Sequence, residues 1–448
     1  MGGDLAPKAV VEGAVRAARD FAIAVCLVGD RTVIERELAE YAHQQLPLTI
    51  EHAAEAVAMD ESPLESVLSK PDSSIQVGLE MLKRGAADAF VSAGNSGAVM
   101  ATAMAILGNL PGVDRPAIAS AVPTTAGRCL LIDAGANTDV KPINLIQFGV
   151  MGSVYWKHAA QIAAPRVAIL ANGEEASKGS DLTRSAAAAL ASMAPDLKYG
   201  GYVEGRDINA AKADVIVTDG FTGNVALKTM EGFATFLLGN LRQLFESGLL
   251  RKLAFLLIRK RLRELRTRLD PSEYGGAPLL GVAGLVIIAH GSSNPHAIRN
   301  AIRAAANEAL VRNVNAEIVE LIARIPAAGT IKQAHPNKGI RGLFLKMRER
   351  LHLPHRESLN EGRSGARPAD GALEAQASDS ATSAGRAGDL SPEARAANSR
   401  KTSTGNLNLP WSNENGVVRE PVHNSESPAG PTEPKLAPPK TPPKTPTQ

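Results

Sequence analysis

The chain has 448 residues, 44% of them hydrophobic, which is enough for a large buried core. Its formal net charge is only +3, so the charge balance argues against nucleic acid as the main partner. The two cysteines, Cys26 and Cys129, lie in apolar runs without metal-ligand spacing, which predicts buried thiols in a reducing cytoplasm. The first residues lack the apolar segment of a signal peptide. Two uncharged runs, 89–113 and 275–298, are broken by Gly, Asn, Ser or Pro and are interpreted as buried strands with turns rather than membrane spans.

The body of the chain repeats one pattern, in which an apolar run typical of a strand is followed by a polar turn and an Ala-rich helical segment. Such alternation predicts an α/β fold whose mainly parallel sheet carries helices on both faces. Two short runs, 117–122 and 129–133, are interpreted as antiparallel neighbours. The other predicted strands are 22–29, 48–52, 89–93, 166–170, 215–218 and 285–289, and the predicted helices include 32–45, 73–84 and 296–325.

The stretch 215–232, VIVTDGFTGNVALKTMEG, predicts a buried strand, a glycine-bearing turn and a helix entered through Asn224. A tight turn before a helix directs backbone N–H groups and the positive end of the helix dipole at one place, which suits an anion such as phosphate. Taken alone, the stretch is explained more simply as an ordinary strand–helix turn with an Asp cap.

Polar motifs follow five of the predicted strands. Because ligands collect beyond the carboxyl ends of parallel strands, we expect the five motifs to converge on one rim of the sheet. Such a rim suits the binding of an oxyanion, although it offers no obvious nucleophile. The chain lacks a P-loop, a dinucleotide fingerprint, a G-x-S-x-G elbow and a cluster with metal-ligand spacing. The motifs are SAGNSG (92–97), DAGAN (133–137), NGEEASKG (172–179), DGFTGN (219–224) and HGSS (290–293).

Residues 233–269 mix basic and apolar side chains, with nine Lys or Arg and two Glu between Arg242 and Arg268. The segment is interpreted either as a helix lying on an anionic membrane surface or as a core or dimer-interface helix with a solvated basic face. After about residue 326 the composition changes to Ser, Gly, Ala, Pro and charge, so we expect a globular domain at 1–326 and a largely disordered tail at 327–448. One basic amphipathic stretch, 340–351, interrupts that tail.

Six motifs, in order along the chain, resemble the bacterial phosphate acyltransferase of phospholipid synthesis. The resemblance runs from Met1 to about Ile325 and does not cover the tail. The motifs are MGGD (1–4), SAGNSGA (92–98), LLIDAGAN (130–137), NGEEASKG (172–179), TDGFTGNVALKTMEG (218–232) and EYGGAPLLGVAGLVIIAHGSS (273–293).

The resemblance implies that acyl carrier protein thioester and inorganic phosphate react to give acyl phosphate and free carrier protein. A membrane glycerol-3-phosphate acyltransferase then uses the acyl phosphate. The resemblance also implies a cytoplasmic homodimer, peripherally attached to the inner face of the membrane, with no cofactor or metal. The implied fold is similar to isocitrate and isopropylmalate dehydrogenases and to phosphotransacetylases. In the family an apolar strand precedes the MGGD motif, so we expect a missing central strand here, with unpaired neighbours and exposed apolar surface.

Phosphate is already an anion, so the site needs fixed orientation and oxyanion donors more than a strong base. Two residues are proposed as catalytic. Lys178 would supply charge for phosphate, the alternative being a solvated loop lysine, and Asn224 would contact phosphate or the thioester oxygen, the alternative being a helix cap. Glu174 or Glu175 is expected to pair with Lys178 or an arginine. The candidates for substrate binding are Asn95, Ser96, Gly97, Asp133, Asn137, Asp219, Gly220, Thr222, Gly223 and His290.

Two of these candidates have alternatives as well. Asp219 is expected to cap and orient rather than titrate, and His290 either donates to the oxyanion or only packs at a strand end. The candidates for membrane or carrier-protein contact are Arg251, Lys252, Leu253, Leu256, Leu257, Arg259, Lys260 and Arg261. Two rival functions remain, an acyl-CoA:phosphate transferase of the phosphotransacetylase type and an inactive membrane-binding scaffold.

Overall fold

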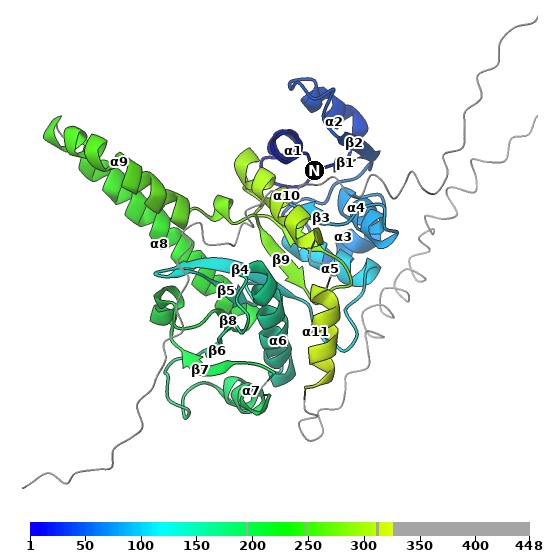
Figure 1. Cartoon of the computed structure of the whole chain (residues 1–448). Helices are drawn as coiled ribbons and strands as arrows, with labels where there is room; N and C mark the ends of the chain where they lie inside the picture. Colours follow the sequence, from blue (N-terminus) through cyan, green and yellow to red (C-terminus); the bar gives the residue numbers. More distant parts are fainter. Residues whose placement is uncertain (194–195, 247–248, 311–312, 326–448) are drawn as a thin grey trace, which may run out of the picture. The chain divides into compact units, whose positions relative to one another are not determined.

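The computed structural model describes residues 1–325 apart from 194–195, 247–248 and 311–312. Strands and helices alternate through most of this part (Figure 1). The tail predicted at 327–448, with its basic stretch, lies outside the described residues. The strands are β1 (Val25–Gly29), β2 (Leu48–His52), β3 (Phe90–Ser92), β4 (Ala117–Thr124), β5 (Gly127–Ile132), β6 (Val167–Leu170), β7 (Tyr199–Val203), β8 (Val215–Val217), β9 (Ala277–Leu280) and β10 (Val286–Ile288).

These strands form a two-stranded parallel sheet, β1–β2, and an eight-stranded sheet in the order β3-β10-β9-β4-β5-β8-β6-β7. The mainly parallel sheet is confirmed, with β3 beside β10 and β5, β8, β6 and β7 side by side in parallel. The antiparallel pair β4–β5 is confirmed as well, in a register that sets Val122 opposite Cys129. Strand β9 is antiparallel to both of its neighbours, β10 and β4. Strands β3 and β10 therefore run opposite to β5, β8 and β6.

Helices cover both faces of the large sheet, as predicted. One face packs Leu130, Val215 and their alternate neighbours against α6, whereas the other packs Leu131 and Ile216 against α8. The helices are α1 (Lys8–Phe21), α2 (Arg31–Leu38), α3 (Pro63–Ser69), α4 (Ser74–Lys83), α5 (Ser96–Ile106), α6 (Pro142–Ala159), α7 (Asp181–Ser192), α8 (Gly220–Glu246), α9 (Leu249–Leu269), α10 (Pro295–Leu310) and α11 (Val314–Ala323), with 3-10 turns at η1 (Gly205–Ala210) and η2 (Pro271–Glu273).

Helix α6 forms the centre of the largest core cluster because it is apolar on nearly all sides. Its close approach to the sheet depends on Gly152, where a Cβ atom would come within 2.8 Å of Val215. Burying a large apolar side chain contributes about 1.5–3 kcal/mol, and Phe148 and Trp156 are almost fully buried here. This core fixes the loops that leave β5 and β8.

Two predicted helices differ from the structure. The helix predicted at 32–45 ends at Leu38, because the chain turns there and the His43 ring contacts the carbonyl oxygen of Tyr41 at 2.9 Å. The helix predicted at 296–325 is two helices, α10 and α11, on either side of the undescribed residues 311–312.

Strands β1 and β3 each have one hydrogen-bonded neighbour within the described residues, β2 and β10 respectively. Both are edge strands of their sheets. Side chains of β1 and β3 share one apolar cluster with α1 and α10, in which Leu27 is buried and Val91 partly buried. Packing of side chains therefore connects the two sheets.

Candidate active site

The five polar motifs do not share one rim, so that prediction is wrong. Loops after β5, β6 and β8 leave one end of the large sheet, and loops after β3 and β10 leave the opposite end. The physical reason is the insertion of β9 and β4, whose antiparallel pairing reverses the direction of the sheet. Helix α8 begins in the first group of loops and runs back along the sheet, so its first turns connect the two groups.

The DAGAN loop after β5 is organised around Asp133, which is fully buried. Its two carboxylate oxygens accept five N–H groups: the backbone of Ile118, Gly135, Ala136 and Asn137, and the side-chain amide of Asn137. Burial raises the pKa of Asp133, whereas the hydrogen bonds from its own loop act in the opposite direction. Only an ionised carboxylate accepts all five donors without opposing one with its own O–H. Asp133 therefore shapes the loop.

Helix α8 begins at Gly220, four residues before the predicted entry at Asn224. Asp219 caps it, because its carboxylate accepts from the backbone N–H of Thr222 at 2.8 Å and from the hydroxyl of the same residue at 2.7 Å. The capping role expected for Asp219 is thus seen.

The glycines that suggested a turn instead permit close packing inside the first helical turn. A methyl group at Gly223 would overlap the carbonyl oxygen of Asp133, and one at Gly220 would lie 2.6 Å from the backbone nitrogen of Asn137. Asn224 is exposed in the second turn and lies beside Gly135 of the DAGAN loop.

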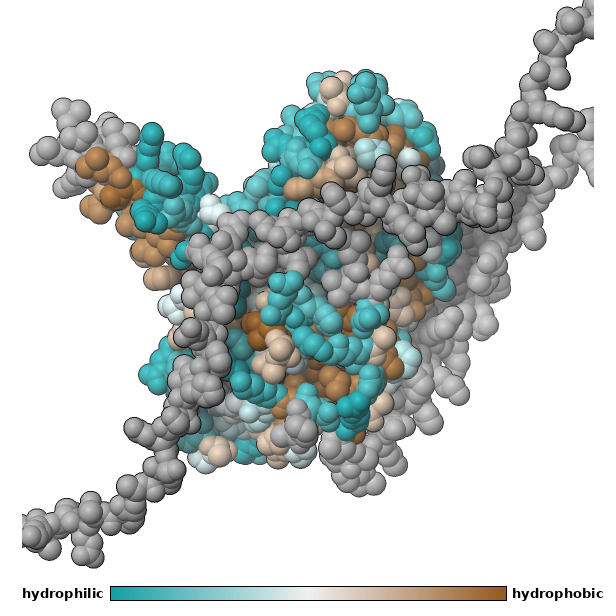
Figure 2. Space-filling model, in the orientation of Figure 1, coloured by the Kyte–Doolittle hydropathy of each residue, from teal (hydrophilic) through white to brown (hydrophobic). Residues whose placement is uncertain are grey.

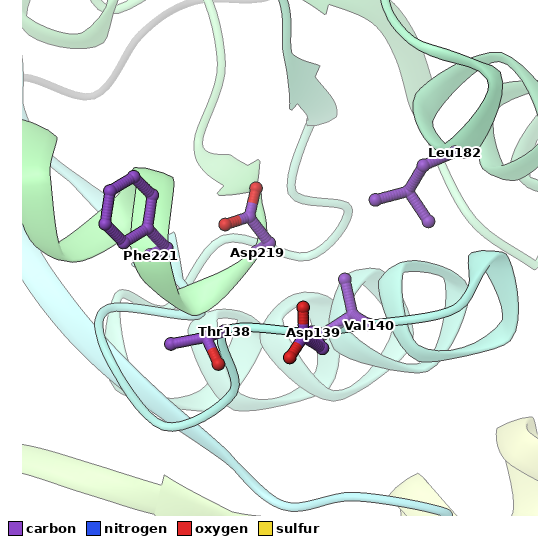
Figure 3. Close-up of a pocket in the computed structure, with 6 residues that line it drawn as sticks. All are labelled: Thr138, Asp139, Val140, Leu182, Asp219 and Phe221. Carbon is purple, nitrogen blue, oxygen red and sulfur yellow. The ribbon is translucent and has the colours of Figure 1, made fainter.

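An open pocket of ≈ 510 Å³ adjoins this helix start. Figure 3 shows Asp219 and Phe221 from the start of α8 on one side and the loop before α6 on the other, with a side chain of α7 at the end. Apolar side chains and two carboxylates suit an uncharged or apolar ligand and disfavour a phosphate anion. The lining residues are Thr138, Asp139, Val140, Leu182, Asp219 and Phe221.

The SAGNSG loop after β3 begins α5, and Asn95 caps that helix. The Asn95 amide also donates to carbonyl oxygens of Ala58, Met59 and Glu61, so both ends of this buried side chain have protein partners. Ser96 and Gly97 are half-buried at the helix start.

The HGSS loop after β10 lies next to the SAGNSG loop and to the MGGD segment. The backbone N–H of Asp4 donates to Gly291, and a Cβ atom at Gly3 would meet carbonyl oxygens of both Ala93 and Gly291. His290 is exposed, and its Nδ1 atom lies 2.7 Å from the Ser292 hydroxyl.

Lys228 connects this second group of loops to α8, and the sequence reasoning missed it. Its ammonium lies 3.0 Å from Nε2 of His290 and 2.7 Å from the carboxylate of Glu231. The sequence contains one signal for this residue: Lys228 follows Asn224 by four residues, so the two share one face of the helix.

Lys178 lies in the exposed loop before α7, where its backbone N–H donates to Glu175. Within the described part of the chain its ammonium has no hydrogen-bond or ion-pair partner, and nothing brings it together with Asn224. The expected partner of Glu174 is also different, since Glu174 pairs with Lys212 rather than with Lys178 or an arginine.

Helices α8 and α9 continue as an antiparallel pair that points away from the sheet (Figure 1). Figure 2 shows apolar residues along one side of this hairpin and polar residues along the other. Phe236 is 65% exposed and Leu257 is 82% exposed, and Arg259, Lys260 and Arg261 are exposed as well. Side chains of the remaining candidates, Arg251, Lys252, Leu253 and Leu256, lie outside the description. No helix in the described ranges has the length and hydropathy to cross a bilayer.

Comparisons with known proteins place the chain in a family. A family model described as fatty acid synthesis protein matches residues 1–317. The phosphate acyltransferase of Geotalea daltonii is 48% identical over 320 residues, which cover 71% of this chain and 92% of that protein. The phosphate acyltransferase of Myxococcus xanthus is 49% identical over 332 residues, which cover 73% and 93%. A solved phosphotransacetylase from Streptococcus pyogenes is similar at a TM-score of 0.48 and 19% identity, covering 68% of this chain and 92% of that one. The chain therefore belongs to the phosphate acyltransferase family and is an acyltransferase.

Proposed function

We propose that the protein transfers a fatty acyl group from acyl carrier protein to inorganic phosphate and so supplies acyl phosphate for phospholipid synthesis. One observation carries this proposal beyond the family. The first two turns of α8 set an open pocket with apolar side chains, including Phe221, beside the exposed amide of Asn224. The acyl thioester needs apolar surroundings and the phosphate anion needs polar donors, so the two substrates require adjoining but different surroundings.

In this reaction a phosphate oxygen attacks the thioester carbonyl carbon, a C–O bond forms and the C–S bond breaks. The thiol of the carrier protein leaves as a thiolate and takes up a proton. Because phosphate is already ionised and the thiolate is a good leaving group, orientation is the main requirement and contributes about 7–11 kcal/mol in favourable cases. One donor to the oxyanion contributes about 3–4 kcal/mol more.

Asn224 is the proposed donor to the phosphate or to the thioester oxygen, and Lys178 is proposed to supply charge. Asp133, Asn137, Asp219, Gly220 and Gly223 would then act by holding the loops around the start of α8, since their polar groups or close contacts serve that packing. Ser96, Gly97, Thr222 and His290 remain proposed substrate contacts, and Asn95 would act through the helix that it caps.

Trapping the product with hydroxylamine tests the reaction. Purified protein, acyl carrier protein thioester and phosphate should yield a hydroxamate, and an equal concentration of acyl-CoA should yield at least about tenfold less. Folded protein that yields none contradicts the proposal, and equal yields contradict the choice of donor. Lys178→Ala and Asn224→Ala should each lower the yield without changing the thermal unfolding temperature.

The exposed apolar side of the α8–α9 hairpin supports three further proposals: peripheral attachment to the inner face of the membrane, docking of the carrier protein, and a homodimer. A basic helix with apolar side chains binds anionic lipid through its charges and through its apolar side. Each nearby basic residue contributes about 1 kcal/mol. Delivery of acyl phosphate to a membrane glycerol-3-phosphate acyltransferase would follow from such attachment.

Flotation with vesicles of anionic lipid tests the membrane proposal. Leu257→Glu places a charge on the most exposed large apolar side chain among the described residues and should abolish flotation, whereas Leu64→Glu makes the same change on α3 and should not. If Leu257→Glu protein still floats and sediments as a monomer where the parent is a dimer, the hairpin is a dimer interface and not a lipid-binding surface.

A further inference from the structure

The pocket at the start of α8 is lined by segments that are far apart in the sequence. Val140 lies just before α6, Leu182 in the first turn of α7 and Phe221 in the first turn of α8. Phe221 is 64% exposed, although phenylalanine side chains are mostly buried in folded proteins. Figure 3 shows the three side chains at separate places around the pocket. The pocket therefore offers apolar contacts from three elements to a ligand that enters from solvent.

The polar side chains of the same pocket are hydrogen-bond acceptors. Asp139 and Asp219 each contribute a carboxylate and Thr138 contributes a hydroxyl, and the six lining residues include no Lys, Arg or His. Carboxylates accept from N–H and O–H groups and repel anions. A ligand that fits this lining is uncharged where it contacts the pocket, has apolar segments and carries N–H or O–H donors.

The two carboxylates differ in how they are held. Asp219 is fixed by the helix cap, in which Oδ1 accepts from the backbone N–H of Thr222 and Oδ2 accepts from its hydroxyl. A carboxylate oxygen has two lone pairs, so each oxygen of Asp219 keeps one for a further donor. Asp139 is exposed, and its side chain has no hydrogen-bond or ion-pair partner within the described ranges. Both carboxylates can therefore accept from a ligand.

The arm of a carrier-protein thioester has the chemistry that this lining requires. Between its sulfur and the phosphodiester at its far end, the arm alternates methylene groups with two secondary amides and carries no charge. The methylenes suit the apolar side chains, and the amide N–H groups suit the carboxylates. A fatty acyl chain has no donors, so it would desolvate both carboxylates without a hydrogen bond in return. The arm fits the pocket better than the acyl chain or the phosphate does.

We propose that this pocket binds the amide-bearing arm of the thioester donor and that Asp139 accepts from the amide farther from the sulfur. The inference rests on the proposed function and deepens it by naming a residue that determines donor specificity. Asp219 precedes Asn224 by five residues, or ~7.5 Å along the helix axis at ~1.5 Å per residue. It is therefore placed to meet the amide next to the thioester, and Asp139, in the loop before α6, is placed to meet the second amide.

Steady-state kinetics with two small donors test the assignment. The acyl thioester of pantetheine contains both amides, whereas that of N-acetylcysteamine contains only the amide nearer the sulfur. Asp139→Ala should raise KM for the pantetheine thioester about 3- to 30-fold, because a hydrogen bond to a charged acceptor is lost. It should leave KM for the N-acetylcysteamine thioester and for phosphate within about twofold. Asp139→Asn keeps an acceptor oxygen and should recover part of the loss, and Asp88→Ala, at an exposed carboxylate before β3, should change none of these constants.

An unchanged KM for the pantetheine thioester in folded Asp139→Ala protein overturns the assignment. An equal rise for both donors overturns it as well, because Asp139 would then act on a part that the two donors share. A rise in KM for phosphate alone has the same consequence.

Binding of pantetheine without an acyl group, followed by saturation-transfer NMR, separates this inference from the proposed reaction. Pantetheine should bind the parent protein and bind Asp139→Ala several-fold more weakly, and this result supports the assignment even if no acyl phosphate forms. Equal binding by the two proteins, both folded by circular dichroism, rejects it, as does absence of binding by the parent. Equal use of acyl-CoA and the carrier-protein thioester would contradict only the proposed donor, since coenzyme A has the same arm.

Discussion

The polar residues at the two ends of the first three turns of α8 differ in how they are hydrogen-bonded and in how far they are exposed. At the first end, Asp133, Asn137 and Asp219 have their polar atoms satisfied by the protein. At the other end, Lys228 and His290 are exposed and their side chains are in contact at 3.0 Å. The polar atoms of the first group are bound by the surrounding protein, whereas the second group is open to solvent.

This difference separates shaping residues from binding residues where sequence motifs do not. Buried polar groups require partners, so a saturated carboxylate such as Asp133 marks a loop that must keep its form. An exposed pair such as Lys228 and His290 contributes less to the fold, since surface contacts are worth about 0–1 kcal/mol. Changes at Asp133, Asn137 and Asp219 should therefore act mainly on stability.

The largest effect on stability is expected for Asp133→Ala. Five N–H groups would lose their acceptor inside the protein, so the free energy of unfolding should fall by about 3–5 kcal/mol in urea titrations. Asp139→Ala changes an exposed carboxylate of the following loop and should alter it by about 0.5 kcal/mol or less. Similar values for both variants would mean that the Asp133 network does not organise the loop.

Gly223→Ala tests the close packing of α8 on the DAGAN loop. The added methyl overlaps the Asp133 carbonyl, so α8 must shift and the protein should lose about 1–3 kcal/mol of stability. Gly232→Ala, in the same helix with open space around it, should instead gain about 0.5–1 kcal/mol from helix propensity. If both variants changed the free energy of unfolding in the same direction, the close packing of the first turn of α8 on the DAGAN loop would be contradicted.

Glu308 of α10 differs from Asp133, since among the described residues its carboxyl has one hydrogen-bond partner, the Tyr155 hydroxyl, where Asp133 has five donors. Burial raises the pKa of Glu308 to about 7. The folded state then binds more protons than the unfolded state between about pH 4.5 and 7, so stability should fall as pH rises through that window.

Glu308→Gln should flatten this dependence and stabilise the protein at pH 8 by about 1–2 kcal/mol, allowing for partial exposure of the side chain. Glu65→Gln, on an exposed face of α3, should reproduce the parent's pH profile. Thermal unfolding between pH 4.5 and 8 is the measurement, and parallel profiles for Glu308→Gln and the parent would contradict the raised pKa.

The smallest effect is expected at the cap of α8. Asp219→Ala removes the acceptor of the Thr222 backbone N–H and should cost about 1 kcal/mol. Thr222→Val removes only the hydroxyl contact and should cost less than half as much in the same urea titration. The reverse ranking would show that the side-chain contact, rather than the cap, holds the helix start.

The sequence predicts the α/β class, most strands and the antiparallel pair β4–β5. These features depend on hydrophobic periodicity, composition and short connections, which are local in the sequence. The order of strands was not predictable, since β9 comes from a segment more than 140 residues after β4 and pairs with it at a distance. The antiparallel strands β9 and β4 between β10 and β5 set the two parts of the sheet in opposite directions and divided the predicted rim.

The candidate site was predicted in its motifs but not in its geometry. Asn224 stayed exposed beside the DAGAN loop, whereas the glycines before it serve helix packing rather than a turn, because their neighbours are distant in the sequence. Lys228 was missed because a lysine inside a helix has no motif of its own. Its spacing of four residues from Asn224 is the one sequence signal, and the contact with His290 is seen only in the structure.

The most direct test places one change at the pocket and one at the proposed phosphate charge in the same kinetic experiment. Phe221→Ser should raise KM for the acyl thioester and leave KM for phosphate within about twofold, and Lys178→Ala should do the reverse. If both variants change the same constant by the same factor, the pocket and Lys178 do not serve donor and acceptor at separate places, and the proposed division of the site is wrong.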